Sequence, residues 1–284
     1  MPKKDGHTHT QFSHHGTTEP LSAYLSHAVS QGFSDYTVTE HAPLPGAFLT
    51  QFTGPVDARD HSAMHEDELA RYCQLVDQLQ AEFQSQLTIH RGFEVDFLVG
   101  FEQDTRQFLD KMVDWTDEIV LSIHFMPNKA GQLAPIDYTP AVLAAAFPEI
   151  VTAPQAVFAR YFDTVQQSLD FAKTLSHPTK IRIGHLTLIR KYQKYFELPA
   201  FNHENLLKIT TILNDMKSAG YELDFNSAGL RKPFNGEPYP TAAIARQAVQ
   251  LGIPLVYGSD AHQVADQGQD YDILENILNQ PLDN

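Results

Sequence analysis

The sequence predicts an α/β protein in which strands and helices alternate, the pattern of a parallel sheet or barrel. Short runs of β-branched or aromatic residues alternate with longer segments of helical periodicity. Gly32, Gly220 and Gly252 each end a helical segment just before the next strand, where a left-handed C-cap is typical. The joints from helix to strand are short, whereas several joints from strand to helix are long.

The expected strands are short runs rich in Val, Ile, Thr, Tyr and Phe. They are the N-terminal stretch up to residue 9, then 36–39, 87–95, 119–125, 180–185, 222–226 and 254–257. The expected helices carry apolar residues at a spacing of three and four. In chain order they are 21–31, 64–86, 104–115, 154–175, 203–219, 241–251 and 271–279. One helix follows each strand, so we expect seven strand–helix units.

The loops expected to carry function are 42–63, 126–153 and 227–240, which follow strands and are rich in Pro, Gly and Asn. In βα barrels the loops after the strands form the active-site face. No linker, low-complexity tract or internal repeat divides the chain. We therefore expect a single domain over residues 1–284.

The composition indicates a folded protein and argues against some partners. With 42% hydrophobic residues and 18 Phe, the chain can bury a substantial core, which excludes disorder. The formal net charge is -15, from 35 acidic and 20 basic side chains. This argues against nucleic acid as a partner, because contacts to its backbone need surplus Lys and Arg. Part of the acidic excess can belong to metal ligands.

Neither the N-terminus nor the single cysteine indicates a special function. No apolar segment typical of a signal peptide follows Met1, and no run approaches transmembrane length. We therefore expect a cytoplasmic protein with no membrane partner. Cys73 shares an apolar helical face with Leu69, Tyr72 and Val76, which indicates core packing.

The placement of the 14 histidines is the central observation, because many of them end predicted strands. The groups at strand ends are His7, His9, His41, Glu94, His124, His185, Asp260 and His262. The spacing of His7 and His9 directs both rings to one side of an extended chain. Parallel strands in a barrel bring their carboxyl ends to one rim. We therefore expect these imidazoles and carboxylates to converge.

Such a cluster predicts a divalent metal site. Buried polar groups without compensation are costly, and imidazole with carboxylate suits zinc, manganese or iron. A single strand-end histidine is more often a hydrogen-bonded rim residue, so the prediction depends on the joint pattern. For the histidines in helices, in loops or within a strand we expect no metal role: His27, His61, His65, His90, His177 and His203.

In order along nearly the whole chain, the motifs resemble those of the PHP (polymerase and histidinol phosphatase) family. They are His-Thr-His at 7–9, His15, Thr-Glu-His at 39–41, Gly-Phe-Glu at 92–94, Ser-Ile-His at 122–124, Gly-His at 184–185 and Asp-Ala-His at 260–262. Longer strings at 5–10, 183–192 and 226–231 resemble its histidinol-phosphatase branch. The resemblance implies a distorted (β/α)7 TIM-like barrel. It also implies hydrolysis of L-histidinol phosphate to L-histidinol and phosphate in histidine biosynthesis.

The same resemblance implies three divalent metal ions (Zn, Fe or Mn) and their ligands. His7, His9, Glu94 and Asp260 would hold the first, a bridging Glu94 with His124 and His185 the second, and His15, His41 and His262 the third. The neighbouring His14 makes the third set ambiguous, although spacing from His9 favours His15. Glu40 stands before His41, where Asp is common in the family.

Phosphate-monoester hydrolysis suits such a site. Metal ions lower the pKa of bound water from about 16 toward 7 and neutralise phosphoryl oxygens, so a metal-activated hydroxide needs no covalent intermediate. The sequence offers no convincing protein nucleophile, because it lacks a G-x-S-x-G elbow and a P-loop, and Cys73 lies in a helix. The string at 5–8 resembles an aspartyl-phosphatase motif only superficially, since a second Asp and a preceding buried strand are missing.

Five basic residues are candidates to bind phosphate through charge-assisted contacts: Arg160, Arg190, Lys191, Arg231 and Lys232. Solvated surface charge explains each about equally well, and explains Arg160 better. Asp260 and His262 are the candidates to protonate the leaving group, and the sequence does not distinguish between them.

Three other interpretations stay open at this point. Another PHP activity would be that of a tyrosine phosphatase, a phosphodiesterase or a nuclease, although the acidic charge speaks against nucleic acid. An amidohydrolase-like barrel also begins with a His-x-His pair, but Glu94 and the ending at 260–262 fit it less well. The third is a metal-binding protein without turnover. We expect a monomer or a small homo-oligomer that acts on a small molecule.

Overall fold

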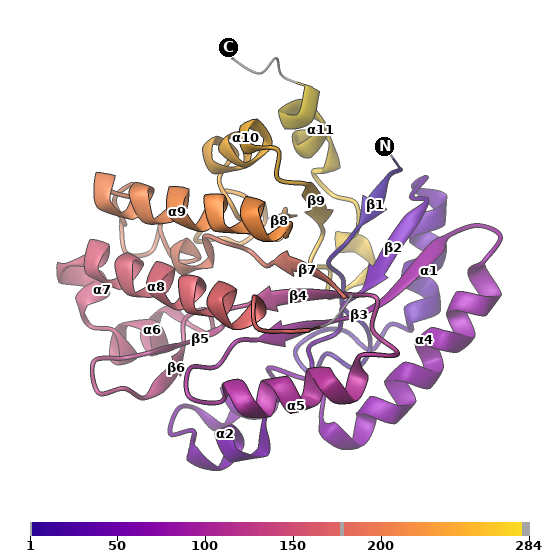
Figure 1. Cartoon of the computed structure of the whole chain (residues 1–284), viewed down its shortest axis with the longest axis horizontal. Coiled ribbons are helices and arrows are strands. Elements are labelled where there is room, and N and C mark those ends of the chain that lie inside the picture. Colours follow the sequence, from indigo (N-terminus) through magenta and orange to yellow (C-terminus); the bar gives the residue numbers. More distant parts are fainter. Residues whose placement is uncertain (1, 177–178, 280–284) are drawn as a thin grey trace.

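The centre of the fold is a sheet of seven parallel strands in the order β1-β2-β3-β4-β7-β8-β9. The computed structural model describes residues 2–176 and 179–279. The strands are β1 (Lys4–Asp5), β2 (Asp35–Val38), β3 (Thr88–Asp96), β4 (Glu118–Ser122), β7 (Lys180–Ile183), β8 (Glu222–Asn226) and β9 (Leu255–Gly258). The segments after β1 and β9 pair through Thr8 and Ala261. The sheet is therefore a nearly closed barrel, as predicted (Figure 1).

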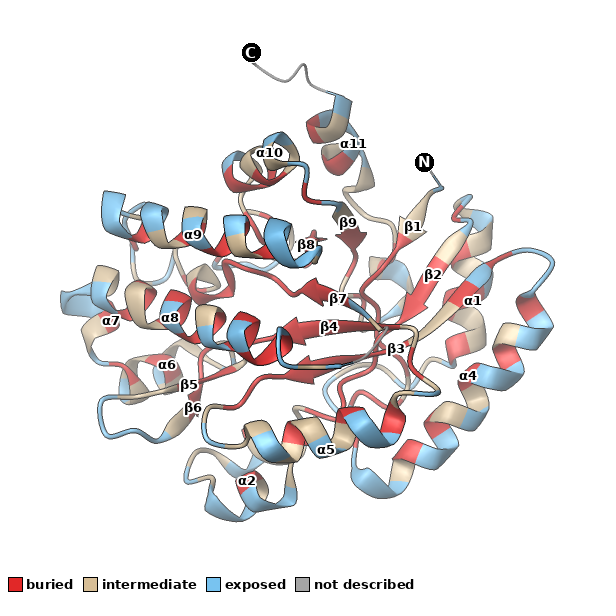
Figure 2. Ribbon diagram, viewed as in Figure 1, coloured by how far each residue is buried: buried red, intermediate tan, exposed pale blue. Residues whose placement is uncertain are grey.

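In the described part of the chain, one longer helix follows each strand of the sheet, and these helices surround the barrel (Figure 1). They are α1 (Leu21–Ser30), α4 (Leu69–Phe83), α5 (Glu102–Met112), α8 (Pro154–Ala172), α9 (His203–Ala219), α10 (Ala242–Leu251) and α11 (Tyr271–Asn279). Figure 2 shows buried strands, and helices whose buried residues alternate with exposed ones. The predicted sequence of seven strand–helix units is confirmed. No helix within the described part of the chain is long and apolar enough to cross a membrane.

The long loops after the strands contain short elements that the sequence analysis did not predict. These are the helices α2 (Gly46–Gln51), α3 (Val56–Asp60), α6 (Pro140–Ala146) and α7 (Glu149–Thr152), and the antiparallel strands β5 (Phe125–Pro127) and β6 (Leu133–Pro135). There are also single 3-10 turns: η1 (Glu66–Glu68), η2 (Leu188–Arg190), η3 (Ala228–Leu230) and η4 (Val264–Asp266). A small apolar cluster, which includes Leu44, Phe48 and Phe125, packs α2 against β5.

The three predicted glycine caps have the backbone conformation that the prediction requires. Gly32, Gly220 and Gly252 have φ values of 77°, 73° and 80°. A residue with a β-carbon is strained in this region, whereas glycine is not. These glycines end α1, α9 and α10 sharply and allow the short joints to the next strands.

Some predicted boundaries were wrong for local reasons. The helix expected over 64–86 begins at Leu69, because Glu68 accepts a hydrogen bond from the His65 N–H at 3.1 Å and a 3-10 turn forms there instead. The strand expected over 119–125 ends at Ser122, since the next residues turn into β5 and the His124 N–H donates to Asp96. His177 lies outside the described residues.

A buried arginine lies in the barrel beneath the segment that carries His7. Arg182 is 1% exposed, and its Nη2 atom lies 2.9 Å from Glu118 and 2.6 Å from Glu222. Its Nη1 atom donates to the carbonyl of Gly6 at 2.5 Å. A β-carbon at Gly6 would lie 2.7 Å from this guanidinium, so the close approach requires glycine. The ion pairs thereby help to position the chain that leads to His7.

Candidate metal centre

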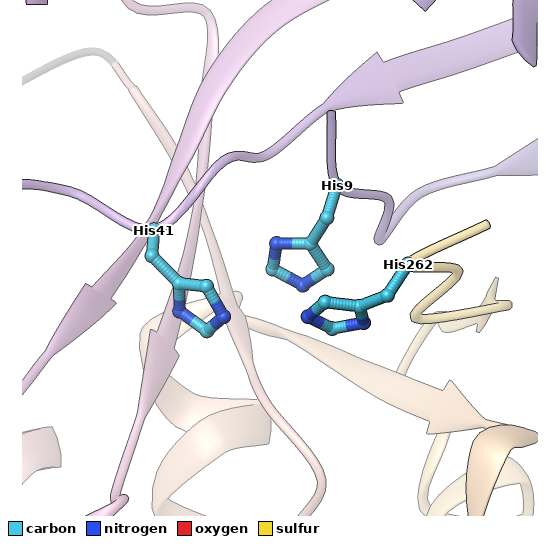
Figure 3. A group of neighbouring side chains, drawn as sticks. All are labelled: His9, His41 and His262. Atoms are coloured by element: carbon cyan, nitrogen blue, oxygen red, sulfur yellow. The ribbon is translucent and has the colours of Figure 1, made fainter. Parts of the chain in front are cut away.

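The ends of the strands bring nine residues together at one rim of the barrel: His7, His9, His15, His41, Glu94, His124, His185, Asp260 and His262. The ring centroid of His9 lies 4.2 Å from that of His41 and 4.1 Å from that of His262. Figure 3 shows these three side chains close together. The rings of His7 and His9 lie 5.3 Å apart, as expected for alternate residues of an extended chain. The role of the nine residues as metal ligands stays a prediction.

Glu94 lies at the centre of this group. Its Oε2 atom is 3.2 Å from Nε2 of His7 and 3.0 Å from Nδ1 of His41. Its Oε1 atom is 2.9 Å from Nε2 of His185 and 3.7 Å from Nε2 of His124. Oε2 also lies 3.5 Å from Nε2 of His9, so the two carboxylate oxygens face different sets of histidines, which is the arrangement that a bridging ligand requires.

The adjacent histidines His14 and His15 point to different surroundings. The ring of His15 lies 4.4 Å from that of His262, and its Nδ1–H donates to the carbonyl of His61 at 2.7 Å. Nε2 of His14 instead lies 2.7 Å from a carboxylate oxygen of Glu68. The geometry therefore groups His15, and not His14, with the cluster at the rim.

Asp260 approaches the cluster from a strained backbone position. Its φ of 50° lies in the left-handed region, which costs free energy for any residue other than glycine. One carboxylate oxygen lies 3.0 Å from Nε2 of His9, and the other accepts a hydrogen bond from the Asn226 amide at 3.1 Å. Such strain is typical of functional sites, where surrounding contacts hold a residue in an uncommon conformation.

The donor atoms of the cluster fit divalent metal ions. The Nε2 atoms of His41 and His262 are buried and have no hydrogen-bond partner within the described residues, which is costly without a ligand. Three groups of residues each offer ligand atoms that all lie within 4.8 Å of one another inside the group. They are His9, His41 and His262; His7, His9 and Glu94; and His41, Glu94 and His124. Imidazole and carboxylate are suitable ligands for zinc, iron and manganese. These groups overlap with the three ligand sets that the family resemblance implies, but they do not match them. His9 and His41 each belong to two of the groups, whereas each belongs to one implied set.

Carboxylates behind the cluster fix the orientation of its rings. Nδ1 of His7 lies 2.8 Å from Asp224, and Nδ1 of His124 lies 2.9 Å from Asp96. Each Nδ1–H therefore donates outward, and Nε2 faces the centre, where it can bind a metal once it has lost its proton, as in many metal sites. The sequence analysis missed both acids. Asp96 could have been found, because it lies two residues after Glu94 on the same face of β3.

Glu40, which stands where Asp is common in the family, also has a positioning role. Its carboxylate lies 3.3 Å from Nδ1 of His9 and accepts hydrogen bonds from the Thr10 N–H at 2.8 Å and hydroxyl at 2.6 Å. It also accepts from the N–H of His41 at 2.9 Å. One buried carboxylate therefore links the two segments that carry His9 and His41.

The electrostatics of the cluster require positive charge. Burial opposes ionisation of Glu94, yet His7, His41 and His124 hold its pKa well below the ordinary value. Burial lowers the pKa of His9, but contacts with Asp260 and a neighbouring glutamate outweigh it and raise the pKa to about 9. Protonated imidazoles thus supply the charge that the carboxylates need. A divalent cation can replace those protons, and its binding then depends on pH.

A cavity of about 340 Å³ opens over the cluster, a size suited to a small molecule. Six of the nine residues line it: His15, His41, His124, His185, Asp260 and His262. A larger cavity of about 460 Å³ lies beside the 42–46 loop and α5, and none of the nine is among the described residues that line it. The smaller cavity is therefore the one that adjoins the candidate metal centre.

Two of the five predicted phosphate-binding residues, Lys191 and Lys232, line the smaller cavity. Lys191 lies 2.9 Å from the carboxylate of Asp137, which the sequence analysis missed and which also lines the cavity. Burial alone would raise the pKa of Asp137, but Lys191 and His124 lower it to about 2. The cavity thus holds two lysines near the proposed metal ligands, one of them paired with an aspartate.

The three predicted arginines have other partners. Arg160 lies 3.1 Å from Glu149, and Arg231 lies 2.7 Å from Asp270. Arg190 donates to a backbone carbonyl at 2.6 Å. None of the three is among the described residues that line the cavity, so contact with a phosphate there requires them to leave these partners. Their role stays a prediction.

Comparison with known proteins identifies the family. The PHP domain matches residues 5–228. The chain belongs to the PHP family. The histidinol-phosphatase of Bacillus subtilis is 37% identical over 275 residues, which cover 96% of this chain and 98% of that protein. The similarity thus extends through β9 and the residues after it, beyond the matched PHP domain.

Solved structures of two proteins named as histidinol phosphatases share the fold. A crystal structure from Listeria monocytogenes, provisionally named a histidinol phosphatase, has a TM-score of 0.91 at 36% identity and covers 95% of this chain and 99% of its own. The histidinol phosphate phosphatase of Lactococcus lactis, solved with Zn, L-histidinol and phosphate, has a TM-score of 0.67 at 19% identity, with 97% and 92% coverage. At that identity the second likeness supports the shared fold alone.

Proposed function

We propose that this PHP protein is a metal-dependent L-histidinol-phosphate phosphatase, which hydrolyses its substrate to L-histidinol and phosphate in histidine biosynthesis. The observation that carries the proposal is the cluster of imidazoles and carboxylates under a cavity of small-molecule size. The near full-length similarity to the Bacillus subtilis histidinol-phosphatase supports the choice of substrate.

The proposed centre holds three divalent ions, Zn, Fe or Mn. The proposed ligands are His7, His9, Glu94 and Asp260 for the first, Glu94, His124 and His185 for the second, and His15, His41 and His262 for the third. The position of Glu94 between His7 and His185 supports the bridging role. Bound ions would supply a water nucleophile at neutral pH and positive charge beside the phosphoryl oxygens.

No covalent intermediate on the protein is needed in this proposal. The lone cysteine, Cys73, lies in α4 on the outside of the barrel, and burial raises the pKa of its thiol to about 11. A thiol with so high a pKa is a poor nucleophile at neutral pH. Ser62 is the only serine or threonine among the described residues that line the cavity. Its hydroxyl donates to a backbone carbonyl and has no histidine partner within the described residues.

Lys191 and Lys232 are the proposed phosphate-binding cations, because both line the cavity. Lys191 is held by Asp137, so its ammonium group is positioned before the substrate binds. Charge-assisted contacts of this kind stabilise a phosphate more strongly than neutral hydrogen bonds do. Arg160, Arg190 and Arg231 would contribute only after leaving their present partners.

Proton transfer is proposed for Asp260 or His262, which lie beside each other at the cavity. Nδ1 of His262 lies 3.0 Å from the carbonyl of Asp260, so this nitrogen donates and Nε2 carries the lone pair. The carboxylate of Asp260 is 19% exposed and can accept a proton from water and return it to the leaving oxygen.

We also infer that residues 1–284 act as one domain. The support is the closure of the barrel by β9 against the segment after β1, through the hydrogen bond from the Asp260 N–H to the His7 carbonyl at 2.8 Å. Lack of a nucleic-acid partner, a cytoplasmic location and a monomeric or small homo-oligomeric state stay predictions.

Phosphate release from a panel of substrates tests the proposed function. L-Histidinol phosphate should be hydrolysed with a kcat/KM at least one hundredfold above those for phosphotyrosine and an oligonucleotide. Preference for phosphotyrosine or the oligonucleotide would instead identify another PHP activity. Absence of turnover on all three substrates by fully metal-loaded protein would refute a phosphoesterase function.

A further inference from the structure

A second group of candidate metal ligands lies on the surface, apart from the nine residues of the rim. One ring nitrogen each of His14 and His65 and one carboxylate oxygen of Glu68 lie within 4.8 Å of one another. His14 belongs to the loop after β1, whereas the other two residues border η1, just before α4. Two imidazoles and a carboxylate form a ligand set that Zn²⁺ accepts, with water in the remaining position.

The three side chains already have a defined arrangement. The rings of His14 and His65 stack at 4.2 Å between centroids, with 19° between their planes. A carboxylate oxygen of Glu68 lies 2.7 Å from Nε2 of His14 and accepts a hydrogen bond from the His65 N–H at 3.1 Å. The carboxylate is therefore held by the backbone of one histidine and faces the ring of the other.

A backbone carbonyl also fixes the tautomer of His65. Nε2 of His65 lies 3.1 Å from the carbonyl oxygen of Asp60. A carbonyl can only accept, so the proton resides on Nε2 and Nδ1 keeps its lone pair. This lone pair faces the backbone N–H of Glu68 in a capping box, a contact that zinc would replace. This is the way in which outer carbonyl groups prepare histidines in known metal sites.

The exposure of the cluster implies weaker binding than at the rim. His14 and His65 are exposed and Glu68 is half-buried. Ligand atoms around zinc lie roughly 3.3 Å apart, since each bond is about 2.0–2.1 Å, so the gap between His14 and Glu68 must open slightly. Exposed side chains allow this movement, but ordering them on binding costs conformational entropy.

We propose that His14, His65 and Glu68 form a separate zinc site of lower affinity, which links the loop after β1 to the segment before α4. The adjacent residue His15 joins the same two segments, because its Nδ1–H donates to the carbonyl of His61. His15 and His61 both line the smaller cavity. Zinc at the surface site therefore restrains one wall of the proposed active site.

Zinc binding by the full-length protein, isolated with its tightly bound ions, tests this proposal. Samples are dialysed to equilibrium against a series of increasing free Zn²⁺ concentrations. The zinc content per chain is then measured by elemental mass spectrometry. The parent protein should take up about one more zinc per chain than His65→Gln, and Glu68→Gln should bind that zinc at least tenfold more weakly. His203→Gln is the matched control, because His203 is an exposed histidine on α9, and it should behave as the parent.

The test is independent of the proposed phosphatase, since no substrate is used. His14 is left unchanged, because its neighbour His15 is a proposed ligand of the rim. Circular dichroism of each variant establishes that it is folded before the dialysis. Equal zinc uptake by the parent and His65→Gln would overturn the proposal, as would a parent that binds no zinc beyond its tightly bound ions.

Discussion

The Oε1 atom of Glu94 lies 2.9 Å from Nε2 of His185, although the two residues are 91 positions apart in the chain. Glu94 belongs to β3 and His185 follows β7, and β4 separates these strands in the sheet. The contact therefore exists only when the parallel strands pair in the observed order. The proposed metal centre is in this sense a property of the whole barrel rather than of any single motif.

Replacement of Glu94 by Gln should disrupt the centre. The change keeps the shape of the side chain but removes the charge shared by His7, His41 and His185. We expect kcat to fall by roughly a hundredfold or more, together with the loss of at least one bound ion per chain. Glu82→Gln, at an exposed position of α4, is the control. Full metal content and unchanged kcat in Glu94→Gln would exclude the bridging role.

Asp96→Asn tests the carboxylates that lie behind the rings. Asp96 accepts from Nδ1 of His124, and the amide keeps a similar shape without the charge. The affinity for metal should fall by about ten- to a hundredfold. The concentration of chelator that removes half of the activity measures this change, with Asp104→Asn on α5 as the control. An identical chelator midpoint in Asp96→Asn and the parent would show that Asp96 does not support a ligand.

The neighbouring residues Arg231 and Lys232 should differ in their effect on catalysis. Lys232 lines the cavity, whereas Arg231 is paired with Asp270. We expect Lys232→Ala to raise the KM for L-histidinol phosphate roughly tenfold, as for the loss of one charge-assisted phosphate contact. Arg231→Ala should have a smaller effect in the same steady-state assay. A larger effect of Arg231→Ala would mean that its guanidinium turns into the cavity when substrate binds.

The buried ion pairs of the barrel should make stability depend on pH. Burial opposes the charge of Glu118, but Arg182 and Lys4 hold its pKa below the ordinary 4.5. Its contribution is therefore fully present above pH 4.5 and is lost as the pH falls through the lower pKa of the folded state. Glu118→Gln should lower the free energy of unfolding by on the order of 3 kcal/mol at pH 7.

Denaturant unfolding of metal-free samples between pH 7 and pH 3 measures this dependence. The free energy of unfolding of Glu118→Gln should fall less steeply below pH 4.5 than that of the parent. The exposed-position variant Glu82→Gln should follow the parent. Parallel curves for the parent and Glu118→Gln would show that this carboxylate does not carry the acid dependence.

The barrel could be predicted from sequence because its signals are local and repeated. Most strands are short runs rich in β-branched or aromatic residues, and three of the helices are followed by glycines with positive φ. The convergence at the rim followed from the rule that parallel strands share a carboxyl edge. Spacing alone favoured His15 over His14, and the ring of His15 does lie beside His262.

Other features depend on contacts that periodicity does not reveal. Asp224 supports His7 across 217 positions, so no local pattern marks it. The lysines and arginines after β7 and β8 cannot be distinguished by sequence pattern. Only the fold shows which of them line the cavity. His65 carried no signal of its own, because its neighbours His14 and Glu68 come together only through the loops.

The most direct test of the central claim follows metal content and turnover in one sample. Ions are removed stepwise with a chelator, and metal per chain and kcat on L-histidinol phosphate are measured at each step. We predict that kcat falls in proportion to the loss of tightly bound ions and returns when Zn²⁺, Fe²⁺ or Mn²⁺ is added back. Full turnover by protein stripped of all metal would contradict the account.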